Sequence, residues 1–408
     1  MDVERLFSDR AKRMKASEIR ELLKLTQRAD IISFAGGLPN PLTFPVPEIE
    51  KACLRVLKEE AGVALQYSTT EGYGPLRDQL AAMMKKDGAP FTADHFVITN
   101  GSQQGLDLLG KVFLNQGDRV LVSNPTYLGA ISAFNTYNCE YVPVASDKEG
   151  MRTDALEETL VRLRKRGERA KFLYTVPTFM NPTGTVMPTA RRKKVLELAH
   201  EHDLLVVEDD PYGKLRFDGD PVPTMASLDK EGRVLYLGTF SKILVPGFRL
   251  AWAAGPEAVI RKMVIAKQAV DLCTNAFTQF VTADMMKAGL IDRHLPQIVA
   301  LYRKKRDIML KAMDAHFPKE NASWTRSQGG LFSWAELPPG VDTEAMLTDA
   351  VANKVAYVPG RPFHIDGSGK NTMRLNFSHP ADEKVKEGVE RLAQVVQAAI
   401  KKLPRQLA

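Results

Sequence analysis

Polar side chains follow five short apolar runs of this sequence, at the point where each run ends. Ser102 and Gln103 come after the run HFVIT (95–99), in a loop that opens a helical stretch. Backbone amides at the start of a helix, together with hydroxyl and amide side chains, form a cradle for an anion. The later runs are followed by an aromatic ring, an amide, a carboxylate with a phenol, and an amine with a guanidinium: Tyr127, Asn181, Asp209 with Tyr212, and Lys242 with Arg249.

This set of groups matches what pyridoxal phosphate needs from a protein. The cofactor requires a phosphate site, a flat partner for its ring, an acid beside its pyridine nitrogen, donors to its phenolate oxygen and an amine for a Schiff base. Lys242 is the candidate amine and would also move the proton. Asp209, three residues before Tyr212, is the candidate acid, and the neighbouring Asp210 is the alternative.

The apolar runs predict the elements that position these residues. From about residue 75 to 300 they alternate with amphipathic helical stretches, and LAWAAG (250–255) is a sixth clear run. Continuous apolar strands separated by helices are typical of a largely parallel sheet that is buried on both faces. Ligands bind such sheets beyond the carboxyl ends of the strands. The sequence therefore predicts an α/β fold with one site at that edge.

The length of 408 residues predicts two domains instead of one core. We expect a large domain at residues 46–300 and a smaller α+β domain at residues 301–408, where the alternation of strands and helices changes character. Residues 1–45, a helical stretch followed by a Gly/Pro-rich loop, are expected to belong with the small domain. A long helical tract is predicted over about residues 278–316.

Three motifs, MNPTG, EDDPY and TFSK with GFR after it, stand in the order and at about the separations of the class I and II aminotransferases, which the chain resembles over nearly its whole length. The resemblance implies fold type I of the pyridoxal-phosphate-dependent transferases, with a mostly parallel seven-stranded sheet in the large domain. It implies that Lys242 holds the cofactor, that Asp209 pairs with the pyridine nitrogen and that Tyr127 stacks on the ring. Tyr212 and Asn181 would bond the phenolate oxygen. Four side chains would hold the phosphate, Ser102, Gln103, Ser241 and Arg249, with Thr239 as a further candidate.

The same resemblance implies substrate and subunit contacts. Arg374, in NTMRLNFS, matches the arginine that clamps the substrate α-carboxylate, close to Gly37 and Asn181, and a planar fork suits that task. Tyr67, in ALQYS, matches a tyrosine that reaches the phosphate of the neighbouring subunit, which implies a homodimer with a shared active site. An aromatic residue of the core or dimer interface is the alternative for Tyr67. Arg20 matches a position that meets a substrate side-chain carboxylate, and it is equally well an ordinary surface partner on its helix.

Within the family, SEIRELLKLTQ, IISFAGGLPNP and ALQYS look like the branch of 2-aminoadipate and kynurenine (aromatic) aminotransferases. We therefore expect a ping-pong transfer of the α-amino group from 2-aminoadipate, kynurenine, an aromatic or a large apolar amino acid to a 2-oxo acid, with 2-oxoglutarate as the expected acceptor. Another reaction on the same scaffold, such as β-elimination, is the alternative. A cofactor-sensing transcription regulator is not expected, because the aminotransferase pattern starts too early to leave room for a DNA-binding module.

Composition and charge narrow the class of protein further. The net charge of +7 is spread along the chain without a long basic block, which favours anionic substrates over nucleic acid. Cys53, Cys139 and Cys273 show no metal-ligand spacing, so no metal site is predicted and reduced thiols in the cytoplasm are expected. No apolar run approaches the length of a membrane span, and no membrane association is predicted.

Overall fold

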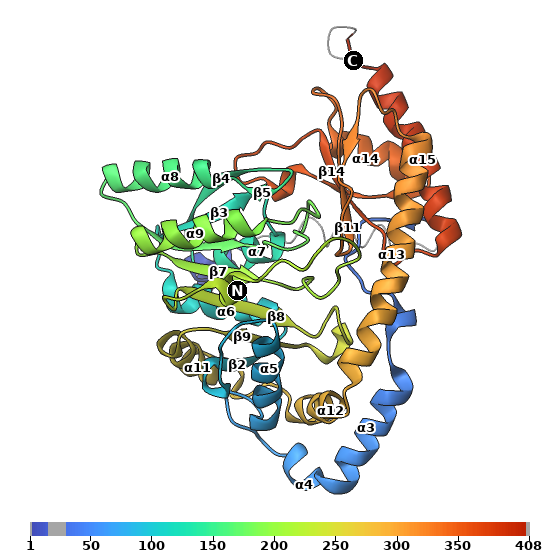
Figure 1. The fold of residues 1–408 in the computed structure, drawn as a ribbon. Coiled ribbons are helices and arrows are strands. Elements are labelled where there is room, and N and C mark those ends of the chain that lie inside the picture. The colour runs from blue at the N-terminus through green and yellow to red at the C-terminus, as the bar shows by residue number, and fades with distance from the viewer. Residues whose placement is uncertain (1, 15–29, 405–408) are drawn as a thin grey trace.

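The computed structural model describes residues 2–14 and 30–404, in which helices flank three β-sheets (Figure 1). The largest sheet has eight strands in the order β2-β9-β8-β7-β6-β3-β4-β5. The bounds of its strands are β2 (Phe96–Asn100), β3 (Arg119–Asn124), β4 (Glu140–Asp147), β5 (Gly150–Met151), β6 (Ala170–Thr175), β7 (Leu205–Asp209), β8 (Val234–Thr239) and β9 (Leu250–Ala254). The predicted α/β fold is confirmed.

Strand directions in this sheet follow from the connections. Strands β8, β7, β6, β3 and β4 are parallel, as continuous apolar runs separated by helices predict. Strand β9 is antiparallel to both of its neighbours, because residues 240–249 return from β8 without a crossover helix. The eighth strand, β5, is a two-residue hairpin partner of β4 beyond the expected seven.

Each face of the large sheet is buried against its own layer of helices. Side chains alternate along a strand, so Phe172 and Tyr174 of β6 join the core formed with α6 and α7, whereas Leu173 joins the core on the opposite face. The helices around the sheet are α3 (Val46–Glu59), α4 (Ala61–Ala64), α5 (Gly74–Lys86), α6 (Ser102–Phe113), α7 (Leu128–Asn135), α8 (Thr153–Lys165), α9 (Thr189–Glu201), α10 (Met225–Leu228), α11 (Glu257–Asp271) and α12 (Ala276–Lys287).

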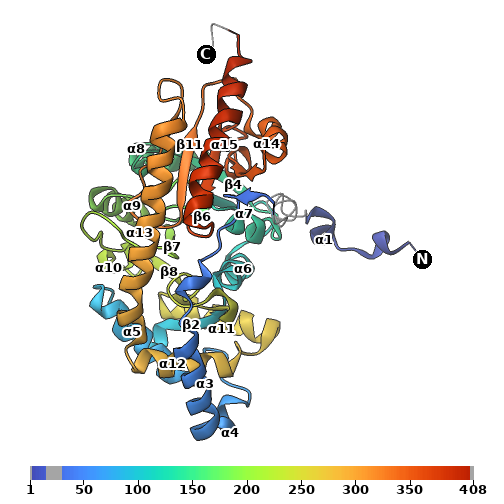
Figure 2. The same cartoon turned by 90° about the vertical axis from the view of Figure 1, so that its right-hand side faces the viewer.

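The last third of the chain forms an antiparallel sheet in the order β10-β11-β14-β13, and a short parallel pair joins β1 to β12. Helices α13 and α15 lie side by side along this part (Figure 2). The bounds are β1 (Ile32–Ser33), β10 (Ser323–Trp324), β11 (Phe332–Glu336), β12 (Val355–Ala356), β13 (Val358–Pro359), β14 (Thr372–Asn376), α13 (Leu290–His316), α14 (Thr343–Ala352) and α15 (Asp382–Lys401). Short turns of helix complete the described chain: η1 (Val3–Leu6), α1 (Asp9–Arg13), η2 (Pro41–Thr43), η3 (Ala93–His95), η4 (Pro246–Phe248) and η5 (Arg361–Phe363).

The predicted helical tract 278–316 consists of two helices, α12 and α13. Gly289 adopts a left-handed conformation with φ 69° between them, which ends the first helix and redirects the chain. The expected domain boundary between residues 300 and 301 falls inside α13, whereas the one between 45 and 46 coincides with the start of α3. The division into domains stays a prediction. The helix expected around Arg20 lies outside the described residues, and no helix in the described part of the chain is long and apolar enough to cross a membrane.

Candidate active site

The N-terminus of α6 offers a cradle for an anion. Gly101 precedes the helix with φ 74° and makes no side-chain cap, so the first amides of α6 keep their donors. A Cβ at Gly101 would lie 2.3 Å from Nη2 of Arg249, so only glycine admits the guanidinium this close to the helix start. Within residues 2–14 and 30–404, the buried hydroxyl of Ser102 has no hydrogen-bond partner. Thr239 donates to the Oγ of Ser241 over 3.0 Å, at the end of the neighbouring strand β8.

Gln103 is placed differently from the other predicted phosphate residues. Its side chain is exposed, and its Nε2 donates to the carbonyl of Gly129 over 2.8 Å. This bond ties α6 to the segment after Tyr127, whose half-buried ring packs against Gly129. A Cβ at Gly129 would lie 2.4 Å from that ring, so the missing side chain lets the ring lie flat against the backbone.

The two candidate acids, Asp209 and Asp210, differ in what their oxygens contact. Asp209 is buried and accepts a 2.7 Å hydrogen bond from the phenol of Tyr174 at Oδ2, whereas its buried Oδ1 has no partner among the described residues. Burial raises the pKa of Asp209 to about 7. Asp210 uses both oxygens, accepting from the amide of Gly213 over 2.8 Å and from the phenol of Tyr236 over 3.1 Å. Only Asp209 keeps an oxygen for another donor.

Lys242 follows β8 and reaches across to the N-terminal segment of the chain. Its Nζ donates to the carbonyl of Gly37 over 2.8 Å. Burial lowers the pKa of Lys242 to about 8, and the positive charges of Arg374 and Arg249 add to this effect. An amine with such a pKa is partly neutral near pH 8, which is the form that acts as nucleophile or base.

Arg374, on β14, is a buried cation between two aromatic rings. Its guanidinium carbon lies 4.4 Å from the ring centre of Phe332 and 5.3 Å from that of Phe363. Nη1 donates to Oδ1 of Asn181 over 2.8 Å, and Nη2 donates to the carbonyl of Ala35 over 2.7 Å. Nε has no partner among the residues that the structure describes. Burial lowers the pKa of Arg374 to about 10.

Among the described residues, the groups whose charge opposes that shift in the pKa of Arg374 are phenols, those of Tyr212 and Tyr127. A buried guanidinium without a carboxylate partner is costly and has unmet affinity for an anion.

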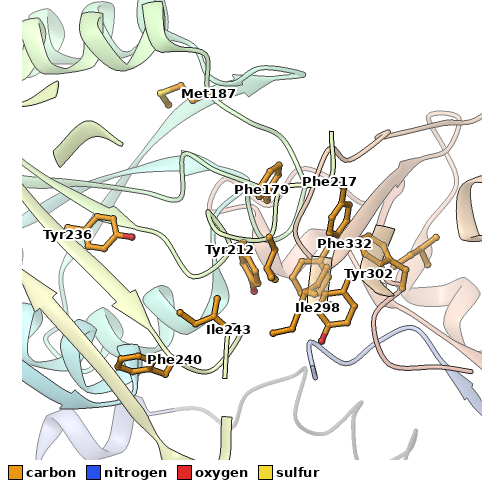
Figure 3. Packing of buried hydrophobic residues seen from close by; sticks show 14 of the residues in the cluster. Phe179, Met187, Tyr212, Phe217, Tyr236, Phe240, Ile243, Ile298, Tyr302 and Phe332 are labelled. Atoms are coloured by element: carbon orange, nitrogen blue, oxygen red, sulfur yellow. The ribbon is translucent and has the colours of Figure 1, made fainter. Parts of the chain in front are cut away.

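Tyr212 lies where the two parts of the chain meet. Its buried ring contacts that of Phe332 edge to face, with centres 5.8 Å apart (Figure 3). Burial holds the pKa of Tyr212 well above its usual value, so the phenol stays a hydrogen-bond donor at neutral pH. The large sheet and the small sheet thus contribute side chains to one site.

Two predicted residues do not join this arrangement. Tyr67 follows α4 and is 79% exposed. Arg20 lies outside the described residues. Gly37 does join the site, and a Cβ at this position would lie 3.3 Å from the ring of Phe332.

Sequence reasoning missed several contacts of the site. Tyr174 was not singled out, because its relation to Asp209 depends on the order and register of two strands. Phe332 and Phe363 were not singled out either, because nothing in the sequence distinguishes a ring beside Arg374 from a ring of the core, and the carbonyl of Ala35 carries no sequence signal. Side chains alternate along a strand, so the position of Tyr174 in KFLYTV could have suggested that it shares a face of the sheet with Asp209.

Comparison with known proteins decides the family. The model of the family described as aminotransferase class I and II matches residues 29–392. The chain belongs to this family. This aminotransferase is 50% identical to aromatic-amino-acid aminotransferase 1 of Thermococcus litoralis over 403 residues, 98% of this chain and 96% of the relative. It is 44% identical to the 2-aminoadipate transaminase of Thermus thermophilus, over 97% of each chain.

Solved structures agree with this family. The crystal structure of Pyrococcus horikoshii kynurenine aminotransferase in complex with PMP matches with a TM-score of 0.95 at 50% identity, over 97% of this chain and 98% of that one. The fold of this aminotransferase is therefore fold type I, and its cofactor is pyridoxal phosphate. The residues present fit that cofactor, because Asp209 has a free buried oxygen, Ser102 a free buried hydroxyl, and Gly101 leaves a cradle beside Arg249.

Proposed function

We propose that this aminotransferase moves the α-amino group of an aromatic amino acid, kynurenine, 2-aminoadipate or a large apolar amino acid to a 2-oxo acid, with 2-oxoglutarate as the acceptor. The observation that carries the proposal is that Arg374 lies close enough to the Lys242 amine for its charge to lower the pKa of Lys242, and that Arg374 itself has no carboxylate partner among the described residues. The names of the relatives support the aromatic and 2-aminoadipate donors.

Arg374 would bind the α-carboxylate common to every donor and acceptor. Two nitrogens of Arg374 can offer parallel donors to a carboxylate. They are Nε, which has no partner among the described residues, and Nη2, which donates to the carbonyl of Ala35 in this structure. Phe332 and Phe363 exclude water from this ion pair and so strengthen it. Because a 2-oxo acid carries the same carboxylate, Arg374 serves both halves of a ping-pong cycle.

The cofactor would be held by residues from several strand ends. Ser102, Ser241, Arg249 and the amides of α6 would hold the phosphate, with Gln103 and Thr239 supporting this loop. Asp209 would bond the ring nitrogen, Tyr212 and Asn181 the phenolate oxygen, and Tyr127 the face of the ring. Bound there, pyridoxal phosphate supplies a carbonyl that takes up the amino group and a ring that accepts the electron pair left when the α-proton departs.

Lys242 would hold the cofactor in the resting enzyme and carry the proton during transfer. Its pKa of about 8 leaves a useful fraction of neutral amine, so Nζ would accept the proton from the α-carbon of the donor and deliver it to the carbon on the other side of the transferred nitrogen. To do so, Nζ must leave the carbonyl of Gly37, which is a neutral acceptor and holds it weakly.

A panel of amino acids, each given without an oxo acid, tests this function. With an accepted donor, we expect the visible absorption of the cofactor-bound protein to fall and one equivalent of oxo acid per site to form. Adding 2-oxoglutarate should restore the absorption. If an amino acid instead releases ammonia over many turnovers without an acceptor, the enzyme catalyses β-elimination and the proposal is wrong.

Replacing Arg374 with lysine should raise the KM of every amino donor and every oxo acid about 10–100-fold, because a point charge cannot replace the two parallel donors. Steady-state kinetics with two donors and 2-oxoglutarate measures this change. The matched control is Arg326→Lys, because Arg326 is an exposed arginine that forms an ion pair with Asp314. This variant should leave KM unchanged. An increase confined to one donor would show that Arg374 contacts a side chain instead of the shared carboxylate.

We propose a homodimer in which Tyr67 completes the site of the partner subunit. Five large apolar side chains are exposed along one short segment: Leu54, Leu57, Val63, Leu65 and Tyr67. So many exposed apolar side chains close together are typical of a surface that a second copy of the chain covers. The segment lies at one end of the molecule in Figure 1, around α3 and α4.

Mixing two inactive variants, Lys242→Ala and Tyr67→Ala, tests the exchange of Tyr67. After subunits re-associate at random, about a quarter of the sites combine an intact lysine with an intact tyrosine, so activity should return to that extent. No recovery, with mixed dimers demonstrated by differently tagged chains, would place Tyr67 outside the partner's site.

We also propose a reducing compartment, the cytoplasm, for this enzyme. Cys53, Cys139 and Cys273 are free thiols in the structure, which supports this location.

A further inference from the structure

Tyr174 and Asp209 face one another across two neighbouring strands. Tyr174 of β6 pairs in register with Val207 of β7, so Asp209 stands two residues further along the same face. Such diagonal neighbours lie about 7–8 Å apart at the backbone, a span that a tyrosine can bridge. The phenol does so, donating to Oδ2 of Asp209 over 2.7 Å.

The position of Tyr174 is fixed by packing. The residue is fully buried, and its ring meets that of Phe134, from α7, edge to face with centres 5.9 Å apart. Burial and the neighbouring carboxylate hold the pKa of Tyr174 well above its usual value, so the phenol can only donate to Asp209.

The hydrogen bond from Tyr174 makes the two carboxylate oxygens of Asp209 different. Oδ2 is occupied by Tyr174, and Oδ1 is buried with no partner in the part of the chain that the structure describes. Burial and the adjacent Asp210 both raise the pKa of Asp209, whereas the bond from Tyr174 lowers it. Tyr212, from the loop after β7, feels the charge of Asp209, and burial raises its pKa so that it stays a neutral phenol at physiological pH. Tyr127 is a further phenol close enough to act on Tyr174.

We propose that Tyr174 is a positioning residue, which turns Oδ1 of Asp209 toward the ring nitrogen of pyridoxal phosphate and keeps the shared proton on that nitrogen. The inference rests on the proposed role of Asp209. A carboxylate that already accepts one hydrogen bond is stabilised in its charged form, so the proton it shares with a pyridine nitrogen resides on the nitrogen. Without the phenol, Oδ2 would be buried and unpaired, and the proton would move to the carboxylate.

Tyr174→Phe removes one oxygen and leaves the ring in its core. The matched control is Tyr236→Phe, because Tyr236 is equally an interior tyrosine on the next strand but one and donates to Asp210, which has no proposed contact with the cofactor. Both variants are loaded with pyridoxal phosphate labelled with ¹⁵N in the ring, and the ¹⁵N chemical shift reports the protonation of that nitrogen. Equilibrium dialysis gives the dissociation constant of the cofactor.

We expect the ring nitrogen to be protonated in the wild-type holoenzyme and in Tyr236→Phe, and its shift to move toward the unprotonated value in Tyr174→Phe. The cofactor should bind about 10-fold more weakly to Tyr174→Phe, because a hydrogen bond to a charged group is lost. The kcat should fall while the KM of the amino donor changes little. If Tyr174 had only a structural role, both substitutions would lower the melting temperature and neither would change the ¹⁵N shift.

A ¹⁵N shift in Tyr174→Phe equal to that of Tyr236→Phe would overturn the inference. If the wild-type protein itself holds no cofactor, the proposed function fails, which is a separate outcome. Should Tyr174→Phe not fold, 3-fluorotyrosine at position 174 keeps the shape and donates more strongly. A second variant, 4-aminophenylalanine at position 174, keeps the ring and donates more weakly than either phenol, so its ¹⁵N shift should move toward the unprotonated value while that of the 3-fluorotyrosine protein stays protonated. An unchanged shift in the 4-aminophenylalanine protein would contradict the proposal.

Discussion

Replacing Lys242 with alanine should abolish the visible absorption of the cofactor-bound protein and lower turnover by at least about 10²–10⁴-fold, the usual contribution of a positioned acid–base group. The change removes both the covalent link to the cofactor and the base beside the substrate. Absorption spectra and single-turnover assays with an accepted donor measure the two losses separately.

Lys194→Ala is the matched control for this change, because Lys194 of α9 forms a half-exposed ion pair with Glu157 of α8. It should retain both absorption and turnover. A visible band that survives in Lys242→Ala would mean that another amine holds the cofactor. Within the described residues, Lys267 is also buried, but its Nζ is bound to Asp271 over 2.6 Å.

Asp209→Asn should lower turnover about 10²–10³-fold, as the loss of one charge-stabilising group in a buried site typically does. It should also stabilise the protein without cofactor. Folding raises the pKa of Asp209 from 3.8 to about 7, so the native state binds more protons than the unfolded state between these values. Stability from this group therefore falls as pH rises through that window, and the amide variant escapes the loss.

Thermal melts of the cofactor-free protein test the sign of this effect. Asp209→Asn should match the wild type near pH 4 and melt about 2–4 °C higher at pH 8. Asp94→Asn, on an exposed carboxylate, should show no such divergence. A variant that melts lower than the wild type at pH 8 would show that the charge of Asp209 stabilises the fold. The cofactor would then not be needed to balance it.

The sequence was sufficient for the residues at strand ends, because an apolar run followed by a polar residue marks both the strand and its carboxyl end. Asp209, Lys242 and Arg374 were found in this way or from their motifs, and the structure brings them to one site. Contacts between distant segments were not accessible. The bond from Tyr174 to Asp209 depends on strand register, and the carbonyls of Ala35 and Gly37 accept from Arg374 and Lys242 through backbone atoms common to every residue.

Features of the fold were missed for similar reasons. The strand β4 mixes polar and apolar residues, since much of it is only partly buried, and so lacked the pattern of a central strand. The direction of β9 depends on a connection without a helix, which an apolar run does not reveal. The break at Gly289 is one residue in a tract that is otherwise helical in composition.

Helix α13 gives the enzyme a mechanical property. It has 27 residues and is therefore about 40 Å long. It packs against α12, beside the large sheet, and against α15, beside the small sheet. The predicted boundary between the domains falls within this helix, so one helix and not a flexible linker would join the two sheets at that point. A bend of about 5° near one end of a helix of this length shifts the other end by about 3–4 Å. Small movements of this helix would therefore be transmitted to the small sheet, whose strand β14 carries Arg374.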